Sequence, residues 1–144
     1  MRPVSLPQPE EVIPHRDPFL FVDEVTELVP GERVRGRWRL RGDEPFFEGH
    51  FPGLPTVPGV LMCEAIAQLG AVALLADERY AGRLPLFGGL DRARFRRQVR
   101  PGDTLELEVE MTRLSSRAGR GSGRALLDGK VAAECDLMFV IADA

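Results

Sequence analysis

Residues 57–76, VPGVLMCEAIAQLGAVALLA, constrain this chain more than any other stretch, because a helix made from them is apolar on nearly every face. Such a helix is buried, either in the core of its own protein or in a membrane. The segment is long enough for a membrane span. However, it contains Glu64 and Gln68, and an acid near the centre of a span costs about 2.5–3.5 kcal/mol. We therefore predict a core helix that begins near Pro58, with no membrane insertion.

The rest of the chain predicts β-strands. Residues 33–41 read RVRGRWRLR and residues 104–114 read TLELEVEMTRL, so that charged and apolar side chains alternate in both. This period of two is typical of a strand with one buried face. Further strands are expected at residues 19–28, 84–99 and 124–142. The last of these reads as a hairpin around Asp128-Gly129, a favoured two-residue turn, whereas GRGSGR at 119–124 is expected to be a turn and no phosphate loop.

One long buried helix among five or six antiparallel strands predicts an α+β architecture. A single apolar helix can cover the apolar face of a sheet if the sheet curves around it, which is the hot-dog fold. The length of 144 residues fits one domain spanning 1–144. The edges of such a sheet are exposed, so edge-to-edge dimerisation is expected.

Composition narrows the function classes. The net charge of −3 offers no general attraction to nucleic acids. Cys63 and Cys135 lie in apolar runs without metal or redox spacing, so they are expected in the core. The N-terminal residues lack the apolar run of a signal peptide, which favours the cytoplasm.

Four residues around the helix start have the chemistry of a small active site. Glu64 lies in the second turn, and Gln68 shares its face one turn later. Gly59 offers a backbone N–H at the positive end of the helix dipole, where an oxyanion can be held. His50, in the loop ahead of the helix, supplies an imidazole that titrates near neutrality. A base, an acid and an oxyanion donor could together remove an α-proton from a thioester and expel a β-hydroxyl as water.

Each of these residues also has a structural interpretation. A single histidine in a loop is more often structural or solvated than catalytic, and a buried Glu64 could be paired with an arginine. Cys63 could be a thiol nucleophile, but nothing in the pattern supplies it with a base. His15 is expected to be structural. The residue pattern alone leaves the catalytic and structural interpretations of His50 and Glu64 open.

Four blocks of the sequence, in order, resemble the FabZ-type bacterial (3R)-hydroxyacyl-[acyl-carrier-protein] dehydratases. They are PHRDPFLFVDEV, EPFFEGHFPGLPTVPGVLMCEAIAQ, GLDRARFRRQVRPGD and DGKVAAECDLM, and they cover roughly residues 12–139. The resemblance implies a hot-dog fold and a homodimer, commonly assembled as a trimer of dimers. It also implies dehydration of (3R)-3-hydroxyacyl-ACP to trans-2-enoyl-ACP in fatty acid biosynthesis, without a metal or redox cofactor.

The resemblance also assigns roles to residues. His50 and Glu64 match the catalytic pair, contributed by different subunits, and Gly59 matches the backbone donor to the thioester carbonyl. Phe51, Gln68 and Phe87 are expected to bind the substrate, which is carried on the phosphopantetheine of acyl carrier protein. Glu64 stands where the isomerising relatives carry aspartate, which implies dehydration without isomerisation. Leu86 stands where members often carry a tyrosine that gates the acyl tunnel.

The arginines have two interpretations. Arg94, Arg96 and Arg97 could dock the acidic carrier protein, since arginine suits phosphate and carboxylate recognition. Alternatively, they and the arginines of 33–41 form a solvated strand face paired with the glutamates of 104–114. Two functional alternatives also stay open: a hot-dog acyl thioesterase, and a non-catalytic module that binds acyl carriers or nucleic acid.

Overall fold

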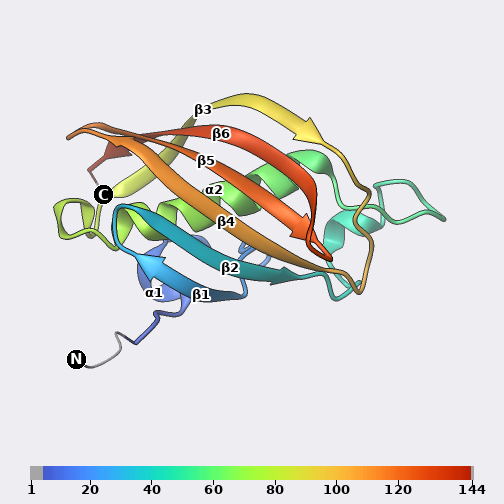
Figure 1. The fold of residues 1–144 in the computed structure, drawn as a ribbon. Helices are drawn as coiled ribbons and strands as arrows, with labels where there is room; N and C mark the ends of the chain where they lie inside the picture. The colour runs from blue at the N-terminus through green and yellow to red at the C-terminus, as the bar shows by residue number, and fades with distance from the viewer. Residues whose placement is uncertain (1–4, 144) are drawn as a thin grey trace.

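The computed structural model describes residues 5–143 of the chain. One six-stranded antiparallel sheet curves around the helix α2, and the strands follow the order β1-β2-β4-β5-β6-β3 across the sheet (Figure 1). The strands are β1 (Glu24–Val29), β2 (Arg33–Arg39), β3 (Leu84–Phe95), β4 (Thr104–Leu114), β5 (Ala118–Leu127) and β6 (Lys130–Ala142). The helices are α1 (Pro9–Val12), α2 (Gly59–Leu75) and the single-turn η1 (Pro45–Phe47) and η2 (Glu78–Tyr80). This arrangement is the predicted hot-dog architecture.

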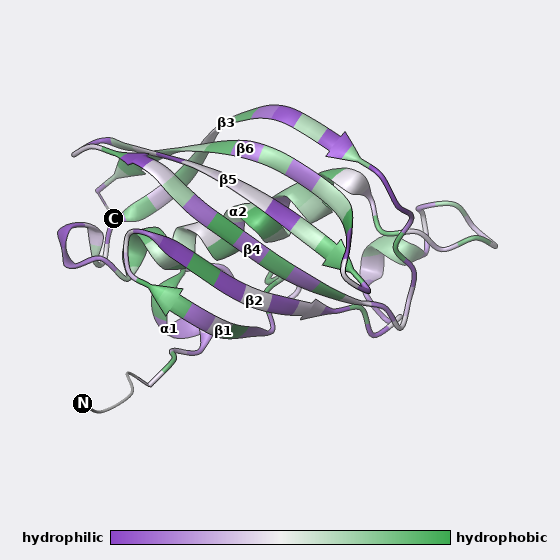
Figure 2. Ribbon diagram, in the orientation of Figure 1, coloured by the Kyte–Doolittle hydropathy of each residue, from purple (hydrophilic) through white to green (hydrophobic). Residues whose placement is uncertain are grey.

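The helix α2 is the centre of the core. Pro58 is its N-cap, and from Met62 to Leu75 every residue except Glu64 is buried. Figure 2 shows why the sheet wraps around it: hydrophobic and hydrophilic residues alternate along strands such as β2 and β4, so that one face of each packs toward the helix and the other meets water. In β2 the buried positions are Val34, Gly36 and Trp38, as the alternation predicted.

The hairpin between β5 and β6 was predicted from Asp128-Gly129 and is confirmed. Both residues have positive φ, 50° for Asp128 and 79° for Gly129, which is the backbone that a two-residue hairpin turn requires. Cys63 and Cys135, expected in the core, are both buried and free. Within residues 5–143, no helix has the length and apolarity that crossing a bilayer would need.

The segment GRGSGR was predicted to be a turn, and this prediction was wrong. Residues 119–124 form the first half of β5, with the glycines buried and the alternating polar residues exposed. The glycine at position 123 is needed because β5 passes very close to the helix α2: a Cβ on Gly123 would lie 2.3 Å from Cγ2 of Ile66 on α2. Glycine therefore marks close packing here, where turn statistics suggested a loop.

The strand predicted over residues 19–28 begins only at Glu24. Directly ahead of β1, the N–H of Asp23 still donates to the carbonyl of Arg37 in β2 at 2.8 Å. Further ahead, the backbones of Phe19 and Phe21 bond to the side chain of Gln68 in α2.

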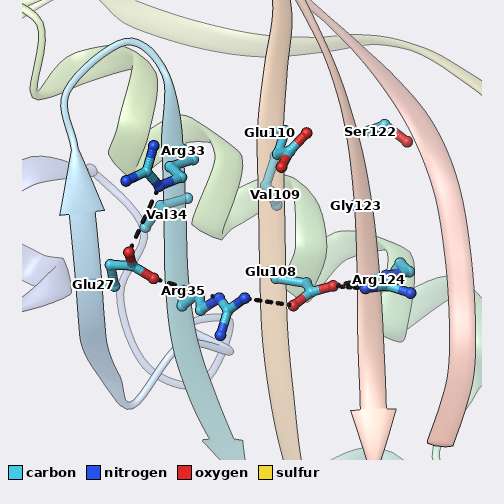
Figure 3. A pocket seen from close by; sticks show the side chains of 10 residues that line it. All are labelled: Glu27, Arg33, Val34, Arg35, Glu108, Val109, Glu110, Ser122, Gly123 and Arg124. Carbon is cyan, nitrogen blue, oxygen red and sulfur yellow. Dashed lines mark hydrogen bonds and ion pairs between the residues drawn. The ribbon is translucent and has the colours of Figure 1, made fainter.

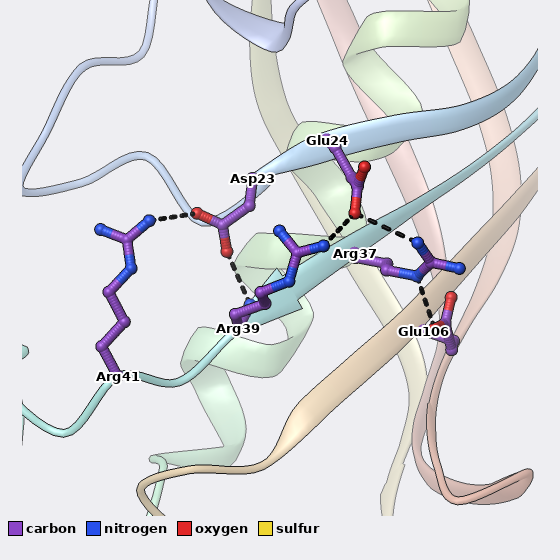
Figure 4. A network of polar contacts seen from close by, with 6 residues as sticks. All are labelled: Asp23, Glu24, Arg37, Arg39, Arg41 and Glu106. Atoms are coloured by element: carbon purple, nitrogen blue, oxygen red, sulfur yellow. Dashed lines mark hydrogen bonds and ion pairs between the residues drawn. The ribbon is translucent and has the colours of Figure 1, made fainter.

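The outer face of the sheet is covered with paired charges, which confirms the solvated-face interpretation of residues 33–41. Arg35 lies between Glu27 at 3.4 Å and Glu108 at 3.7 Å, along a hollow of about 590 Å³ on that face (Figure 3). Arg37 lies 2.7 Å from Glu106 and 3.2 Å from Glu24 (Figure 4). Because these pairs are exposed, each stabilises the fold only weakly, but together they leave little uncompensated positive charge on β2.

Candidate active site

Glu64 opens onto a cavity of about 290 Å³ between α2, the start of β3 and the segment that precedes β1. Its side chain is 19% exposed. The cavity walls are mostly apolar and include Phe19, Ala71 and Phe87. Among the lining residues only His15 and Glu64 are ionisable. The arrangement therefore offers one acid at the wall of a space that suits an aliphatic chain.

Gln68 anchors the Glu64 carboxylate. Its Nε2 donates to Oε2 of Glu64 at 2.8 Å and to the carbonyl of Phe19 at 2.9 Å, and its Oε1 accepts from the N–H of Phe21 at 2.7 Å. The side chain is 1% exposed, and this set of partners satisfies a buried amide. The sequence predicted that Gln68 and Glu64 share a helix face, but it contained no sign that Gln68 ties α2 to residues 19–21.

His15 lies at the same cavity, with its Nε2 3.7 Å from Oε2 of Glu64. Burial lowers its pKa below the ordinary 6.5, while the negative charge of Glu64 acts in the opposite direction and Arg16 adds to the lowering. The sequence analysis expected His15 to be structural, because it matches the family resemblance outside the catalytic pair. The structure instead makes it a neighbour of the predicted acid.

His50 is oriented by the loop that precedes α2. Its Nδ1 lies 2.7 Å from the carbonyl oxygen of Thr56. A carbonyl oxygen can only accept, so Nδ1 carries a proton, and the neutral form of the ring has its lone pair on Nε2. The ring of Phe51 packs against the imidazole at a centroid distance of 4.1 Å, and Phe51 has a φ of 67°, a left-handed conformation that is unusual for a bulky residue. The loop thus presents His50 as a proton acceptor.

The start of α2 has the features expected of an oxyanion donor. No side chain caps the helix at Pro58, so its first N–H groups are available. The ring of Phe95 packs closely against Gly59: a Cβ there would lie 2.8 Å from Cδ1 of Phe95. Only glycine therefore fits at this position with the present packing.

The structure separates the residues predicted for the site into two groups. Glu64, Gln68 and Phe87 line one cavity, together with Leu86. His50, Phe51 and Gly59 are not among the described residues that line this cavity. One chain alone therefore does not bring the predicted base and acid to the same cavity.

Cys63, the alternative nucleophile, is 1% exposed. The neighbouring thiol of Cys135 lowers the pKa of Cys63 against the opposing effect of burial, whereas Cys63 and burial raise the pKa of Cys135. The structure thus gives Cys63 the environment of a core residue. Within residues 5–143, no group of three or more histidine, cysteine, aspartate or glutamate side chains is arranged to hold a metal ion.

Comparison with known proteins identifies the family. Residues 13–136 match the model of the FabA-like domain. The chain belongs to the FabA-like family. Among FabA-like proteins, it is 50% identical over 137 residues to a protein of Staphylococcus epidermidis named 3-hydroxyacyl-[acyl-carrier-protein] dehydratase FabZ, covering 95% of this chain and 94% of that one. A FabZ of Desulforamulus reducens is 53% identical over 132 residues, covering 92% of this chain and 93% of the relative.

Solved structures support the FabA-like fold. The dehydratase heterocomplex ApeI:P of Xenorhabdus doucetiae matches with a TM-score of 0.83 at 18% identity, covering 96% of this chain and 93% of that one. A mutant of the phenylacetic acid degradation protein PaaI from Thermus thermophilus matches with a TM-score of 0.62, also at 18% identity, covering 83% of this chain and 91% of that one. At these identities the likeness concerns the fold alone.

Proposed function

We propose that this chain dehydrates (3R)-3-hydroxyacyl groups, carried on the phosphopantetheine of acyl carrier protein, to trans-2-enoyl groups during fatty acid biosynthesis in the cytoplasm. The observation that carries the proposal is the near-full-length identity of about 50% to proteins named as FabZ dehydratases. Glu64, held by Gln68 in a mostly apolar cavity, supplies the acid that such a reaction needs.

In the proposed mechanism, Nε2 of His50 takes the α-proton of the acyl thioester. The developing negative charge on the carbonyl oxygen is held by the N–H of Gly59 at the start of α2. Glu64 gives a proton to the β-hydroxyl, the carbon–oxygen bond breaks, and water leaves as the double bond forms. No step needs a metal or a redox group, so we expect activity to survive exhaustive dialysis against a chelator.

The site is proposed to form between two subunits, with His50 from one and Glu64 from the other. This is supported by the separation of the two residues within one chain and by the exposed apolar side chains on the sheet edge at β3. Among them are Leu86 and Leu90, exposed by 47% and 41%. A homodimer joined along β3 would cover this edge, and a trimer of dimers is the assembly that the family suggests.

Subunit mixing tests the shared site. His50→Ala and Glu64→Gln chains are each expected to be inactive, but a heterodimer of the two contains one intact site. Once native mass spectrometry has demonstrated exchange, we expect each heterodimer to have up to half of the activity of a wild-type dimer. If exchanged dimers stay inactive, the two residues do not come from different subunits.

The carrier protein is proposed to dock on the arginines at the end of β3 and directly after it. Arg96 already lies 2.7 Å from Glu134, whereas Arg94 and Arg97 have no acidic partner among the described residues. This segment is tied to the His50 loop, because Gln98 donates to Oγ1 of Thr56 at 2.6 Å. Arg94 and Arg97 are therefore the stronger candidates to meet an acidic carrier beside the site.

Charge reversal tests the docking surface. Arg97→Glu should raise KM for a carrier-protein substrate by about 10-fold and spare a short CoA analogue, since a charge at the edge of an interface acts mainly on encounter. Arg113→Glu is the matched control, because Arg113 lies near the C-terminal end of β4, whereas Arg97 lies ahead of the start of that strand. An equal effect on both substrates, or the same effect in the control, would exclude docking at Arg97.

Mass spectrometry of a 3-hydroxyacyl-ACP tests the reaction itself. Wild type should remove one water, and folded His50→Ala and Glu64→Gln variants should not. Free acyl acid would instead identify a thioesterase. An unchanged substrate across several chain lengths would favour a non-catalytic binding module. Measurement of salt-dependent binding to nucleic acid and to the carrier would then show which of the two it binds.

A further inference from the structure

The two oxygens of the Glu64 carboxylate have different surroundings. Oε2 accepts from Nε2 of Gln68 at 2.8 Å and faces Nε2 of His15 at 3.7 Å. Among the described residues, Oε1 has no hydrogen-bond partner, and the carboxylate lies at the cavity wall. One oxygen is thus held by the protein, while the other is available to a molecule in the cavity.

The tautomer of His15 follows from its surroundings. Its Nδ1 is buried and has no hydrogen-bond partner within residues 5–143. A buried N–H without an acceptor is rarer in proteins than an acceptor without a donor. A lone pair on Nε2 would also face the negative Oε2 of Glu64. Both arguments put the proton on Nε2, so that an N–H is directed at Glu64.

The position of His15 is set by the backbone around it. The guanidinium of Arg16 donates to the carbonyls of Ile13 at 2.8 Å, His15 at 2.6 Å and Glu10 at 3.1 Å. Ile13 is 1% exposed and anchors the segment in the core. The imidazole is therefore held beside the carboxylate by a folded segment whose own carbonyls are satisfied.

We propose that His15 is a positioning residue for Glu64: its neutral imidazole directs an Nε2–H at Oε2, so that His15 and Gln68 together hold this oxygen and leave Oε1 as the one that protonates the leaving hydroxyl. The proposal rests on the proposed role of Glu64 as the acid. The distance of 3.7 Å is longer than a hydrogen bond, and such contacts often tighten when the substrate binds.

A neutral imidazole suits this role better than a charged one. Burial lowers the pKa of His15, the charge of Arg16 adds to this lowering, and the two outweigh the opposing effect of Glu64 on α2. A cation next to Glu64 would hold the carboxylate ionised and oppose its action as an acid. A neutral donor orients Oε2 without this effect.

Three substitutions separate positioning from packing. The amide nitrogen of Gln can stand where Nε2 of the imidazole stands, that of Asn stands nearer to Nδ1, and Leu fills space without a donor. We expect H15Q to keep kcat within about 3-fold of wild type, and H15N and H15L to lose about 10-fold, with KM changed less than about 3-fold in each, as for a lost transition-state contact. Unchanged kcat in all three, or equal loss in all three, would overturn the proposal.

Nuclear magnetic resonance tests the same geometry without any assay of activity. The chain has two histidines, so a long-range ¹H–¹⁵N spectrum of the imidazoles resolves both. We expect the Nε2–H tautomer for His15, shifted by Glu64→Gln, and the Nδ1–H tautomer for His50. An Nδ1–H tautomer at His15 would refute the proposal even if the variants fail to fold. Failure of the proposed function would appear separately, as a wild type that removes no water or an active Glu64→Gln variant.

Discussion

Replacement of Gln68 should weaken both the fold and the chemistry, because one buried amide serves three groups. Gln68→Leu preserves the approximate size of the side chain but removes its bonds to Phe21, Phe19 and Glu64. The N–H of Phe21 is left buried without a partner, which costs about 1–3 kcal/mol. The other two groups are partly reached by water and lose about 0.5–1.5 kcal/mol each. We therefore expect a loss of about 2–6 kcal/mol in the free energy of unfolding.

Gln68→Glu is the sharper variant, because its shape is the same. It can still accept from Phe21, but when ionised it cannot donate to Phe19 and it places a second carboxylate against Glu64. We expect it to be destabilised at pH 7 by at least as much as Gln68→Leu, and kcat to fall by about 10-fold or more in both because Oε2 of Glu64 loses its anchor.

Urea denaturation at matched protomer concentration measures these changes, since stability in an oligomer depends on concentration. Gln98→Leu is the control: its amide bonds Thr56 at the surface, and such a change should stay within about 0.5 kcal/mol. If both Gln68 variants lie within 1 kcal/mol of wild type, the residue does not join α2 to the segment before β1.

Three further predictions concern packing, pH and specificity. Gly123→Ala should destabilise by about 1–3 kcal/mol because its Cβ would lie 2.3 Å from Ile66; thermal unfolding that matches exposed Ser122→Ala would contradict this close approach. The folded-state pKa of His15 is lowered below 6.5, so its contribution to stability is present above pH 6.5 and is lost as the pH falls through the folded value. Urea midpoints should therefore fall more steeply below pH 6.5 in wild type than in H15Q. Parallel curves for the two proteins would count against a lowered pKa at His15. Leu86→Ala should shift kcat/KM toward longer acyl chains by about 10-fold. Val140 is the cross-strand neighbour of Leu86 but does not line the cavity, so Val140→Ala should leave the chain-length preference unchanged. Identical chain-length profiles for wild type and Leu86→Ala would show that Leu86 does not limit the cavity.

The elements were predictable wherever one physical cause dominated. The apolar helix, the alternation in β2 and β4 and the turn at Asp128-Gly129 each depend on local pattern alone. The glycines of β5 were misread because glycine serves both turns and close packing, and only the position of Ile66 distinguishes the two. Long-range polar contacts were the least predictable, since nothing in the local sequence connects Gln68 with residues 19–21.

The same division applies to the candidate site. Motif and family resemblance pointed to His50, Gly59 and Glu64, because the chemistry of these groups is visible in their type and spacing. The resemblance included His15 without a catalytic part, and its place beside Glu64 could not be predicted, because it depends on where a loop without periodic pattern meets the helix. Groups with catalytic chemistry can thus be recognised in a motif, whereas the residues that contact and orient them need coordinates.

Each of the two proposed catalytic residues is held through one atom and keeps another free. His50 binds the carbonyl of Thr56 through Nδ1, which leaves Nε2 as acceptor. Glu64 accepts from Gln68 on Oε2, which leaves Oε1 for a molecule in the cavity. In a dimer, the acyl group would lie between the base of one subunit and the acid of the other, each with one atom left for the reaction.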